Sequence, residues 1–452
     1  MDFLDKLVIP QSMEHIQLLK TMLIVTYIIL LPYLGVLFGT VLFSVMYNSK
    51  GRRLNNPVYI KFSKNLIDVL TQNKSMAFGL GAVPMLSAIF CYAQLLHQSN
   101  VGVTENMIFA LILFLAAVIA IYTYKYSFHL KDVLKLVEHN SKASNITDEK
   151  VVNDFKAYQN RTNKMLLKSG TYGLVLLALS LYIFVGSMQL ANDSSRWGEG
   201  ISIVSILFSS STFIYFLFYI SASFVLTSLC VIYLFFKHEN DSVEQDAEYS
   251  SFVKNFSLKT ALIFTGIQFI LVAVSLFTLP DISLSYSVFG YTLISLSLLL
   301  VIINLVYFMI KESSLRFRNS ALFLFLIFFV FIIIKDQYAF ETSSQIQFKE
   351  LAENYTVYEE DLKKEFGTFT ESISGADIYN GRCIACHQYD KKVVGPPYNS
   401  VLPKYEGDLE ALSSYILNPV KVNPEYPAMP NQGLKPNEAK AVAEYLMNTY
   451  KQ

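Results

Sequence analysis

Residues 383–387 read Cys-Ile-Ala-Cys-His, and this stretch decides how the C-terminal part of the chain folds. Two thiols at this spacing can add to the two vinyl groups of one haem, and the adjacent imidazole then meets the iron from the same side. A redox dithiol and half of a zinc site are the alternatives. The first does not need the histidine, and the sequence has no second cysteine pair to complete the other. The stretch predicts covalent haem held by Cys383 and Cys386, with His387 as a ligand of the iron.

The sequence after the box supplies a second axial ligand. Met429 lies in a proline-braced loop, Tyr-Pro-Ala-Met-Pro, at residues 426–430. We expect Met429 on the far side of the iron, because His/Met ligation is one of the common arrangements and raises the reduction potential. Met447 is the rival ligand. It lies in the run 436–450, which predicts a helix that begins at a proline, so we expect Met447 in or near the core.

A helix is also predicted upstream, at residues 375–379, where Gly375 would let the last helix approach near Tyr445 and Leu446. With the box, the Gly-Pro-Pro at 395–397 and Met429, the segment from about residue 370 to the end resembles a class I cytochrome c. The resemblance implies a small α-helical domain that carries one haem c and transfers single electrons. Its six-coordinate iron would leave no position for chemistry on a bound substrate.

The rest of the chain predicts a membrane protein. Of all residues, 53% are hydrophobic and 16% are charged, and runs of about 20 apolar residues indicate spanning helices. The fold class is therefore all-α, a polytopic bundle plus the small haem domain. We expect no cleaved signal peptide, because the first apolar run is too long. Eight spans are predicted, at about 20–47, 76–97, 104–126, 169–191, 201–236, 260–279, 286–310 and 319–335.

The distribution of positive charge predicts the topology. Four loops, at 48–75, 127–168, 237–259 and 311–318, are rich in Lys and Arg, whereas the intervening loops hold only Arg196. The positive-inside rule places the basic loops in the cytoplasm, so eight spans leave both termini outside. Haem c attachment also takes place outside the bacterial cytoplasm. We therefore expect a multi-pass protein of the bacterial inner membrane whose haem domain is periplasmic.

Three regions follow from these boundaries: a membrane domain at 1–335, a polar segment at 336–369 and the haem domain at 370–452. The polar segment is either a tether with some helix in it or a packed spacer. A tether would raise the effective concentration of the haem domain at a docking surface.

The membrane domain contains a candidate internal repeat, 1–191 and 200–335. Tyr-x-x-Phe-x-Lys-Asn-Leu at 59–66 follows the first span, and Tyr-x-x-Phe-x-Lys-Asn-Phe at 249–256 follows the fifth. Four spans separate the two motifs, so both halves would have the same orientation. The predicted bundle is therefore two four-helix repeats.

The first half resembles subunit I of the cytochrome bd quinol oxidase superfamily. The resemblance rests on Gln17 and Thr21, on Leu-Pro-Tyr-Leu-Gly at 31–35 and on Phe-Gly-Leu-Gly-Ala-Val-Pro at 78–84. It implies two four-helix bundles, an outside N-terminus and pairing with a homologous subunit.

Two departures from that family concern its cofactors. Val25, Thr26 and Tyr27 stand where the family has a haem-ligating histidine, and only a few residues around Pro280 replace its long quinol-binding loop. None of the six histidines lies centrally in a predicted span, so a haem b is not expected. Ligation by His15 or His97 near the outer face is the open alternative.

Charged residues are missing from the middle of every predicted span, which argues against a pump or channel. Glu105, at the start of the third span, is expected to be a first-turn residue favoured by the helix dipole.

The leading hypothesis is a membrane-anchored monohaem cytochrome c that acts as an electron-transfer subunit of a bacterial respiratory or related redox complex. Its partners would be other subunits of that complex, a soluble or membrane cytochrome and the lipid bilayer, with no nucleic acid. A divergent bd-superfamily oxidoreductase with a fused cytochrome is the second hypothesis. A transporter or sensor with a haem input domain is the third.

Overall fold

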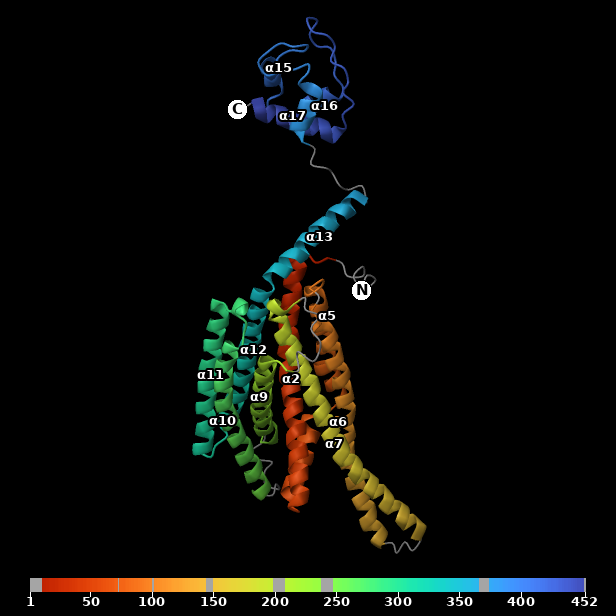
Figure 1. Ribbon diagram of the computed structural model, residues 1–452, viewed down its shortest axis with the longest axis vertical. Coiled ribbons are helices and arrows are strands. Elements are labelled where there is room, and N and C mark those ends of the chain that lie inside the picture. Colours follow the sequence, from red (N-terminus) through yellow and green to blue (C-terminus); the bar gives the residue numbers. More distant parts are fainter. Residues whose placement is uncertain are drawn as a thin grey trace. The chain divides into compact units, whose positions relative to one another are not determined.

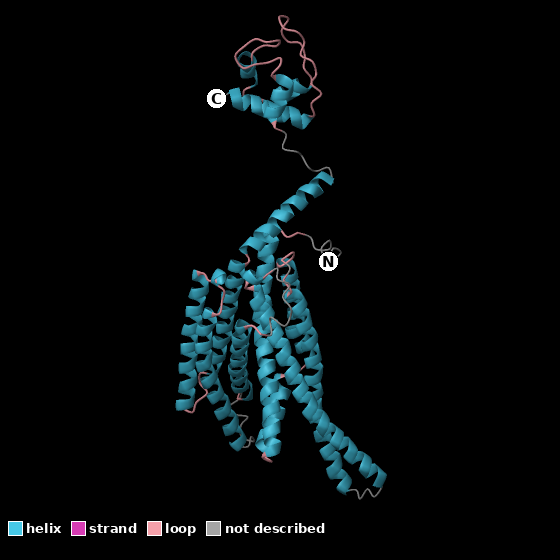
Figure 2. Ribbon diagram, in the orientation of Figure 1, coloured by secondary structure: helices cyan, strands magenta, loops and turns pink. Residues whose placement is uncertain are grey.

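The computed structural model describes residues 10–71, 73–99, 101–143, 149–197, 208–236, 247–365 and 374–450. Throughout these residues the chain forms helices and loops without a strand, as Figure 2 shows, and the all-α prediction is confirmed. The chain divides into two compact units, one up to Thr356 and one from Val357 onward. The first unit thus extends beyond the boundary expected at residue 335.

Eight helices of the described residues are long and apolar enough to cross a membrane, which agrees with the predicted number. Seven of them are single helices, and the second span is built from α4 (Lys74–Ala77), a π-helical turn (Phe78–Ala82) and α5 (Val83–Leu95). Part of the expected fifth span, residues 201–207, lies outside the described residues. The seven are α2 (Met13–Arg53), α6 (Val103–Ala143), α7 (Glu149–Ala191), α9 (Ser210–Phe235), α10 (Ala247–Phe277), α11 (Tyr286–Lys311) and α12 (Arg318–Ser343).

Helices α6 and α7 continue well beyond their apolar segments. They are 41 and 43 residues long, about twice what a bilayer requires, and pack against each other along their length. Most of the basic loop expected at 127–168 is therefore a paired helical extension, which reaches past the neighbouring helices in Figure 1. Residues 129–139 and 149–161 of this extension are exposed or half-buried, and the Gln159 amide of α7 donates to the Glu138 carboxylate of α6 at 2.8 Å. Glu105 lies in the first turn of α6, as expected.

The centre of the bundle is a close crossing of α2 and α9. A Cβ atom on Gly39 would clash with the Thr227 side chain and would lie 2.8 Å from the Ser223 carbonyl oxygen. A Cβ atom on Gly35 would lie 3.5 Å from the Ser223 hydroxyl. Small residues one turn apart bring two backbones together in this way inside membranes.

The two repeated motifs meet at one end of this crossing. The first lies on α3 (Pro57–Leu70), a short helix whose start is capped by the Asn56 side chain, and the second begins α10. The Phe62 and Phe252 rings are 5.3 Å apart, and the Asn65 amide donates to the Tyr249 hydroxyl at 2.8 Å. Side chains of the two motifs thus form one aromatic cluster, which also contains Phe43, Tyr47 and Phe256.

At the opposite end, α12 is followed by α13 (Gln345–Glu365). The first part of α13 packs on the bundle through Phe348 and Leu351, which are buried. Lys20 of α2 and Glu341 of α12 form an ion pair of 2.6 Å there. The polar segment expected after residue 335 is thus helical from 345 to 365, and its first turns are packed.

The second unit is a small helical domain with its own core. It contains α14 (Gly375–Ile378), which continues as a π-helical turn (Tyr379–Cys383), then α15 (Tyr398–Val401), a 3₁₀ turn (Leu402–Tyr405), α16 (Leu409–Leu417) and α17 (Pro436–Tyr450). The helices expected at 375–379 and at 436–450 are confirmed.

A crossing of α14 and α17 holds the two ends of this domain together. A Cβ atom on Gly375 would clash with the Ala441 carbonyl oxygen and would lie 2.7 Å from Cβ of Tyr445, so the close approach expected at this glycine is present. The core between the helices includes Leu402, Leu412, Val442 and Leu446.

Candidate functional site

The Cys-Ile-Ala-Cys-His box forms a tight turn at the end of the first helix of the small domain. The backbone nitrogens of Cys386 and His387 both donate to the carbonyl oxygen of Cys383, at 3.1 and 2.9 Å. Cys383 is buried and Cys386 is partly buried, and neither forms a disulfide. The turn brings both thiols and the imidazole into one short loop. Attachment of both thiols to one haem whose iron the imidazole binds requires this proximity.

The imidazole of His387 is held from two sides. Its Nδ1 atom lies 3.0 Å from the Pro396 carbonyl oxygen, and the Tyr398 ring stacks on it at 5.1 Å between centroids and 14° between planes. A carbonyl only accepts, so Nδ1 carries the proton and donates to it, and the lone pair of Nε2 is free for a metal. This arrangement fixes the tautomer and the direction of the ring before any ligand binds.

Gly395 completes this support. Its backbone nitrogen donates to the Cys386 carbonyl oxygen at 2.9 Å, which ties the Gly-Pro-Pro loop to the box. A Cβ atom at this position would lie 2.7 Å from both nitrogens of the His387 ring. Only glycine therefore lets the loop lie so close to the imidazole.

Met429 lies, partly buried, in an irregular segment that precedes α17. This segment is anchored by its backbone: Arg382 of the π-helical turn donates to the Gln432 carbonyl oxygen at 2.7 Å, and Asn431 donates to that of Leu417 at 3.0 Å. The Arg382 contact links the methionine loop to the box. Met447, the rival ligand, is 7% exposed and belongs to the core on α17, where it was expected.

The donor set fits a covalently bound haem. Two unpaired thiols, an imidazole with a free Nε2 and a thioether on an anchored loop are the groups that such a haem requires. Apolar side chains are exposed on the surrounding loops, as the hydrophobic edge of a porphyrin needs: Ile384, Val393, Val394, Val420 and Val422. Within the described residues, no cluster of three or more His, Cys, Asp or Glu residues could hold a separate metal ion.

Burial raises the pKa of the Cys383 thiol, and the neighbouring Cys386 adds to the effect while Arg382 opposes it. Burial likewise raises the pKa of Tyr398 beneath the imidazole, so its hydroxyl stays neutral at physiological pH.

The four residues predicted to bind haem all lie in this domain, and their roles stay a prediction; sequence reasoning missed two features that support the His387 ring. The Pro396 carbonyl and the Tyr398 ring contact His387 only in the folded domain. The Gly-Pro-Pro triplet was the one sequence signal for them.

The bundle holds an ionisable pair that the sequence reasoning overlooked. Lys335 and Asp336 lie inside α12, their side chains are 1% and 7% exposed, and their charged atoms are 2.9 Å apart. The predicted span ended at Lys335, so we expected no charge inside it. In the structure α12 continues to Ser343, and the pair therefore lies within the helix. Burying them is affordable because each is next to its counter-charge.

Comparisons with known proteins match the small domain. The model of the family described as cytochrome c matches residues 372–449. Cytochrome c-551 of Pseudomonas denitrificans is 32% identical over 79 residues, which cover 16% of this chain and 95% of that protein. Cytochrome c-552 of Nitrosomonas europaea is 34% identical over 70 residues, 14% of this chain and 67% of that protein. No solved structure matches the chain.

Proposed function

This chain belongs to the cytochrome c family through its C-terminal domain, and from that premise we propose that it is a membrane-anchored monohaem cytochrome c that serves as an electron-transfer subunit of a bacterial respiratory or related redox complex. The observation that carries the proposal is the preset imidazole of His387, whose Nδ1 is bonded to Pro396, beside two free thiols on a chain with eight candidate spans. Haem supplies the one-electron couple.

The roles of the individual residues are part of the proposal. Cys383 and Cys386 attach the haem, His387 is the proximal ligand and Met429 the distal one. The Pro396 carbonyl makes the imidazole a stronger electron donor to the iron by accepting a hydrogen bond from its Nδ1–H group. The single His/Met haem is expected to exchange electrons with a soluble or membrane cytochrome, and with other subunits of the complex.

The proposed location is the bacterial inner membrane, with both termini and the haem domain on the periplasmic side. The basic loops gather at one end of the bundle, which supports this topology. There Lys64 of α3 pairs with Asp132 of α6 at 2.5 Å, and Lys254 of α10 donates to the Ser313 carbonyl after α11. The positive-inside rule assigns that end to the cytoplasm.

The first test is whether this chain carries haem c and which methionine binds it. The full-length protein is purified from a bacterial host that matures c-type cytochromes, and haem is stained after denaturing electrophoresis. Wild type retains one covalent haem per chain, and the Cys383→Ala, Cys386→Ala double variant loses it. Haem that acid-acetone extracts completely from the wild type contradicts covalent attachment.

A potentiometric titration then separates the two methionines. Met429→Ala lowers the midpoint potential because a thioether ligand favours the reduced iron, whereas Met447→Ala leaves the potential in place and only weakens the core. The opposite pattern assigns the distal position to Met447.

The second candidate function is a divergent oxidoreductase of the cytochrome bd superfamily. The meeting of the two repeated motifs at Phe62 and Phe252 favours it, since it supports two related halves in the bundle. It needs membrane haem ligands, yet His15 is exposed at the start of α2 and His97 follows the last turn of α5. Haem b or d that remains extractable from the purified chain, beside haem c, supports this candidate. Haem c alone leaves the bundle as anchor and partner platform.

A further inference from the structure

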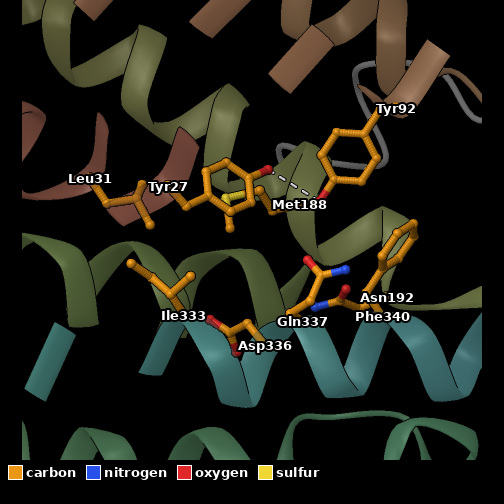
Figure 3. Close-up of a pocket in the computed structure, with 9 residues that line it drawn as sticks. All are labelled: Tyr27, Leu31, Tyr92, Met188, Asn192, Ile333, Asp336, Gln337 and Phe340. Carbon is orange, nitrogen blue, oxygen red and sulfur yellow. Dashed lines mark hydrogen bonds between the residues drawn. The ribbon is translucent and has the colours of Figure 1, made fainter. Parts of the chain in front are cut away.

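A second polar site lies inside the bundle, where α12 faces α2, α5, α7 and α9. It surrounds a small, partly enclosed cavity with a volume of about 10 Å³. Figure 3 shows α12 contributing Asp336 and Gln337, with the hydrogen-bonded Tyr27–Tyr92 pair opposite them. The other lining residues are Leu31, Met188, Asn192, Ile333 and Phe340.

Three deeply buried polar atoms at this site have no hydrogen-bond partner within the described residues. They are Oδ1 of Asp336, Nε2 of Gln337 and the hydroxyl of Tyr219, and their residues are 6%, 7% and 4% exposed. Lys335 lies 2.9 Å from the Asp336 oxygen but not in hydrogen-bonding geometry. The Asp336 oxygen thus has only its ion-pair partner, and the Gln337 amide nitrogen has no acceptor, which is costly unless something bridges them. The cavity is just large enough for one water molecule.

Lys335 does not depend on Asp336 alone. Its ammonium donates to the Tyr215 hydroxyl at 3.3 Å and lies 5.2 Å from the centre of the Tyr215 ring. When Asp336 takes up a proton, Lys335 therefore keeps two favourable contacts and can stay charged. Tyr215 also contacts the Asp336 carboxylate, and the other titratable groups around it are Tyr27 of α2, Tyr92 of α5 and Tyr219 of α9.

The cavity lies next to an open groove. The groove has a volume of about 420 Å³ and is formed by the start of α2, the end of α12 and the first half of α13. Glu341 and Lys20 line it, whereas Phe340, the neighbour of Glu341, lines the cavity. The Phe340 ring packs between Tyr92 of the cavity, at 5.3 Å, and Phe348 of the groove, at 5.7 Å. This ring separates the buried site from the groove.

We propose that Asp336 and Gln337 bind one water molecule, and that Asp336 exchanges a proton through it with the aqueous phase at the end of the bundle where α12 ends. A hydronium ion arriving by the groove gives its proton to the Asp336 carboxylate and leaves as water, so the charge of the Lys335–Asp336 pair changes from zero to one. Ionisable groups inside a membrane bundle are expensive to keep and commonly mark such proton sites. Phe340 controls access.

Infrared difference spectroscopy on the full-length protein in lipid nanodiscs tests the proposal while the buffer pH is cycled. Among the carbonyl stretches of protonated carboxylic acids that appear on acidification, the component of Asp336 should shift in D₂O and be missing from the Asp336→Asn difference spectrum. Asp281→Asn is the matched control, because this aspartate is exposed in a loop at the same end of the bundle, and it should keep the band. A band that is absent from the wild type, or that Asp336→Asn leaves unchanged, overturns the proposal.

Two further variants test the water and the route without removing the charge. Gln337→Leu removes the amide beside the carboxylate and should shift the carbonyl band, and an unshifted band overturns the bound water. Phe340→Ala should speed the D₂O shift of the band, whereas an equal rate overturns the groove as the route. Both readouts are independent of haem c, so they neither require nor test the electron-transfer function.

Discussion

Gly395→Ala should destabilise the haem domain through the proximal imidazole. A methyl group there would overlap Cε1 of the His387 ring and would lie 2.7 Å from each ring nitrogen, so the ring or the backbone must move by roughly 1 Å to reach an ordinary contact. Neither is free to move, because the Gly395 nitrogen is hydrogen-bonded to the Cys386 carbonyl and the ring is hydrogen-bonded to the Pro396 carbonyl. Overpacking of this kind costs about 1–3 kcal/mol, and a broken Nδ1 hydrogen bond adds about 1 kcal/mol.

Gly381→Ala is the matched control for this substitution. Gly381 lies in the π-helical turn of the same box, and a Cβ atom there meets no atom within 4 Å. Replacing a helical glycine in open space should raise the stability by about 0.5–1 kcal/mol, so the two variants are expected to have opposite signs.

The assay is a guanidinium titration of the full-length holoprotein, in which the haem Soret band reports the small domain alone. Gly395→Ala should unfold at lower denaturant than the wild type, and Gly381→Ala at equal or higher denaturant. Equal midpoints for the two variants would show that the loop yields freely around His387, and would refute the claim that Gly395 fixes the imidazole.

Three further outcomes are expected. Gly39→Ala should lower the thermal midpoint of the membrane unit in detergent, by an overpacking cost of about 1–3 kcal/mol at the α2–α9 crossing, whereas Gly266→Ala, which meets nothing within 4 Å, should not. Phe62→Ala should cost about 3–5 kcal/mol in the same assay because the ring is 0% exposed, and Phe90→Ala, 50% exposed, is its control. When the protein is produced without haem, Cys383 should be alkylated more slowly than Cys386 at neutral pH. Burial shields the Cys383 thiol, and its raised pKa leaves less thiolate. Mass spectrometry of the labelled peptides measures the order of alkylation.

The haem domain could be predicted well because its signals are local. The Cys-x-x-Cys-His box fixes its own turn, and Pro436 begins α17 at the expected residue. Gly375 predicted a close crossing with the last helix, and the structure contains it. The Pro396 carbonyl could not be predicted, since a backbone oxygen has no residue type by which to recognise it.

The bundle was harder to predict where its charges are neutralised by tertiary contacts. Lys335 and Asp336 end an apolar run in the sequence, yet α12 continues because Tyr215, 120 positions away, gives the ammonium a third contact. The extensions of α6 and α7 were predicted as a basic loop. They pack against each other, and this tertiary contact is visible only in the fold.

The contacts at the two ends of the bundle agree to different degrees with the predicted repeat. In two halves related by a two-fold axis, equivalent residues meet on the axis and other contacts occur in reciprocal pairs. Phe62 and Phe252 hold the same place in the two motifs and touch, as that symmetry requires. Asn65 donates to Tyr249, but its counterpart Asn255 donates to Ser251 on its own helix, so the reciprocal bond is not made.

The divergence is greater at the end where α12 terminates. There α12 supplies a charged pair, whereas α7, its counterpart as the last span of the first half, supplies only Met188, and the turn after it Asn192, to the cavity. A structural scaffold has no need for a buried charge in one half alone. The asymmetry therefore agrees with the proposed proton site, which would lie on α12 in the second half alone.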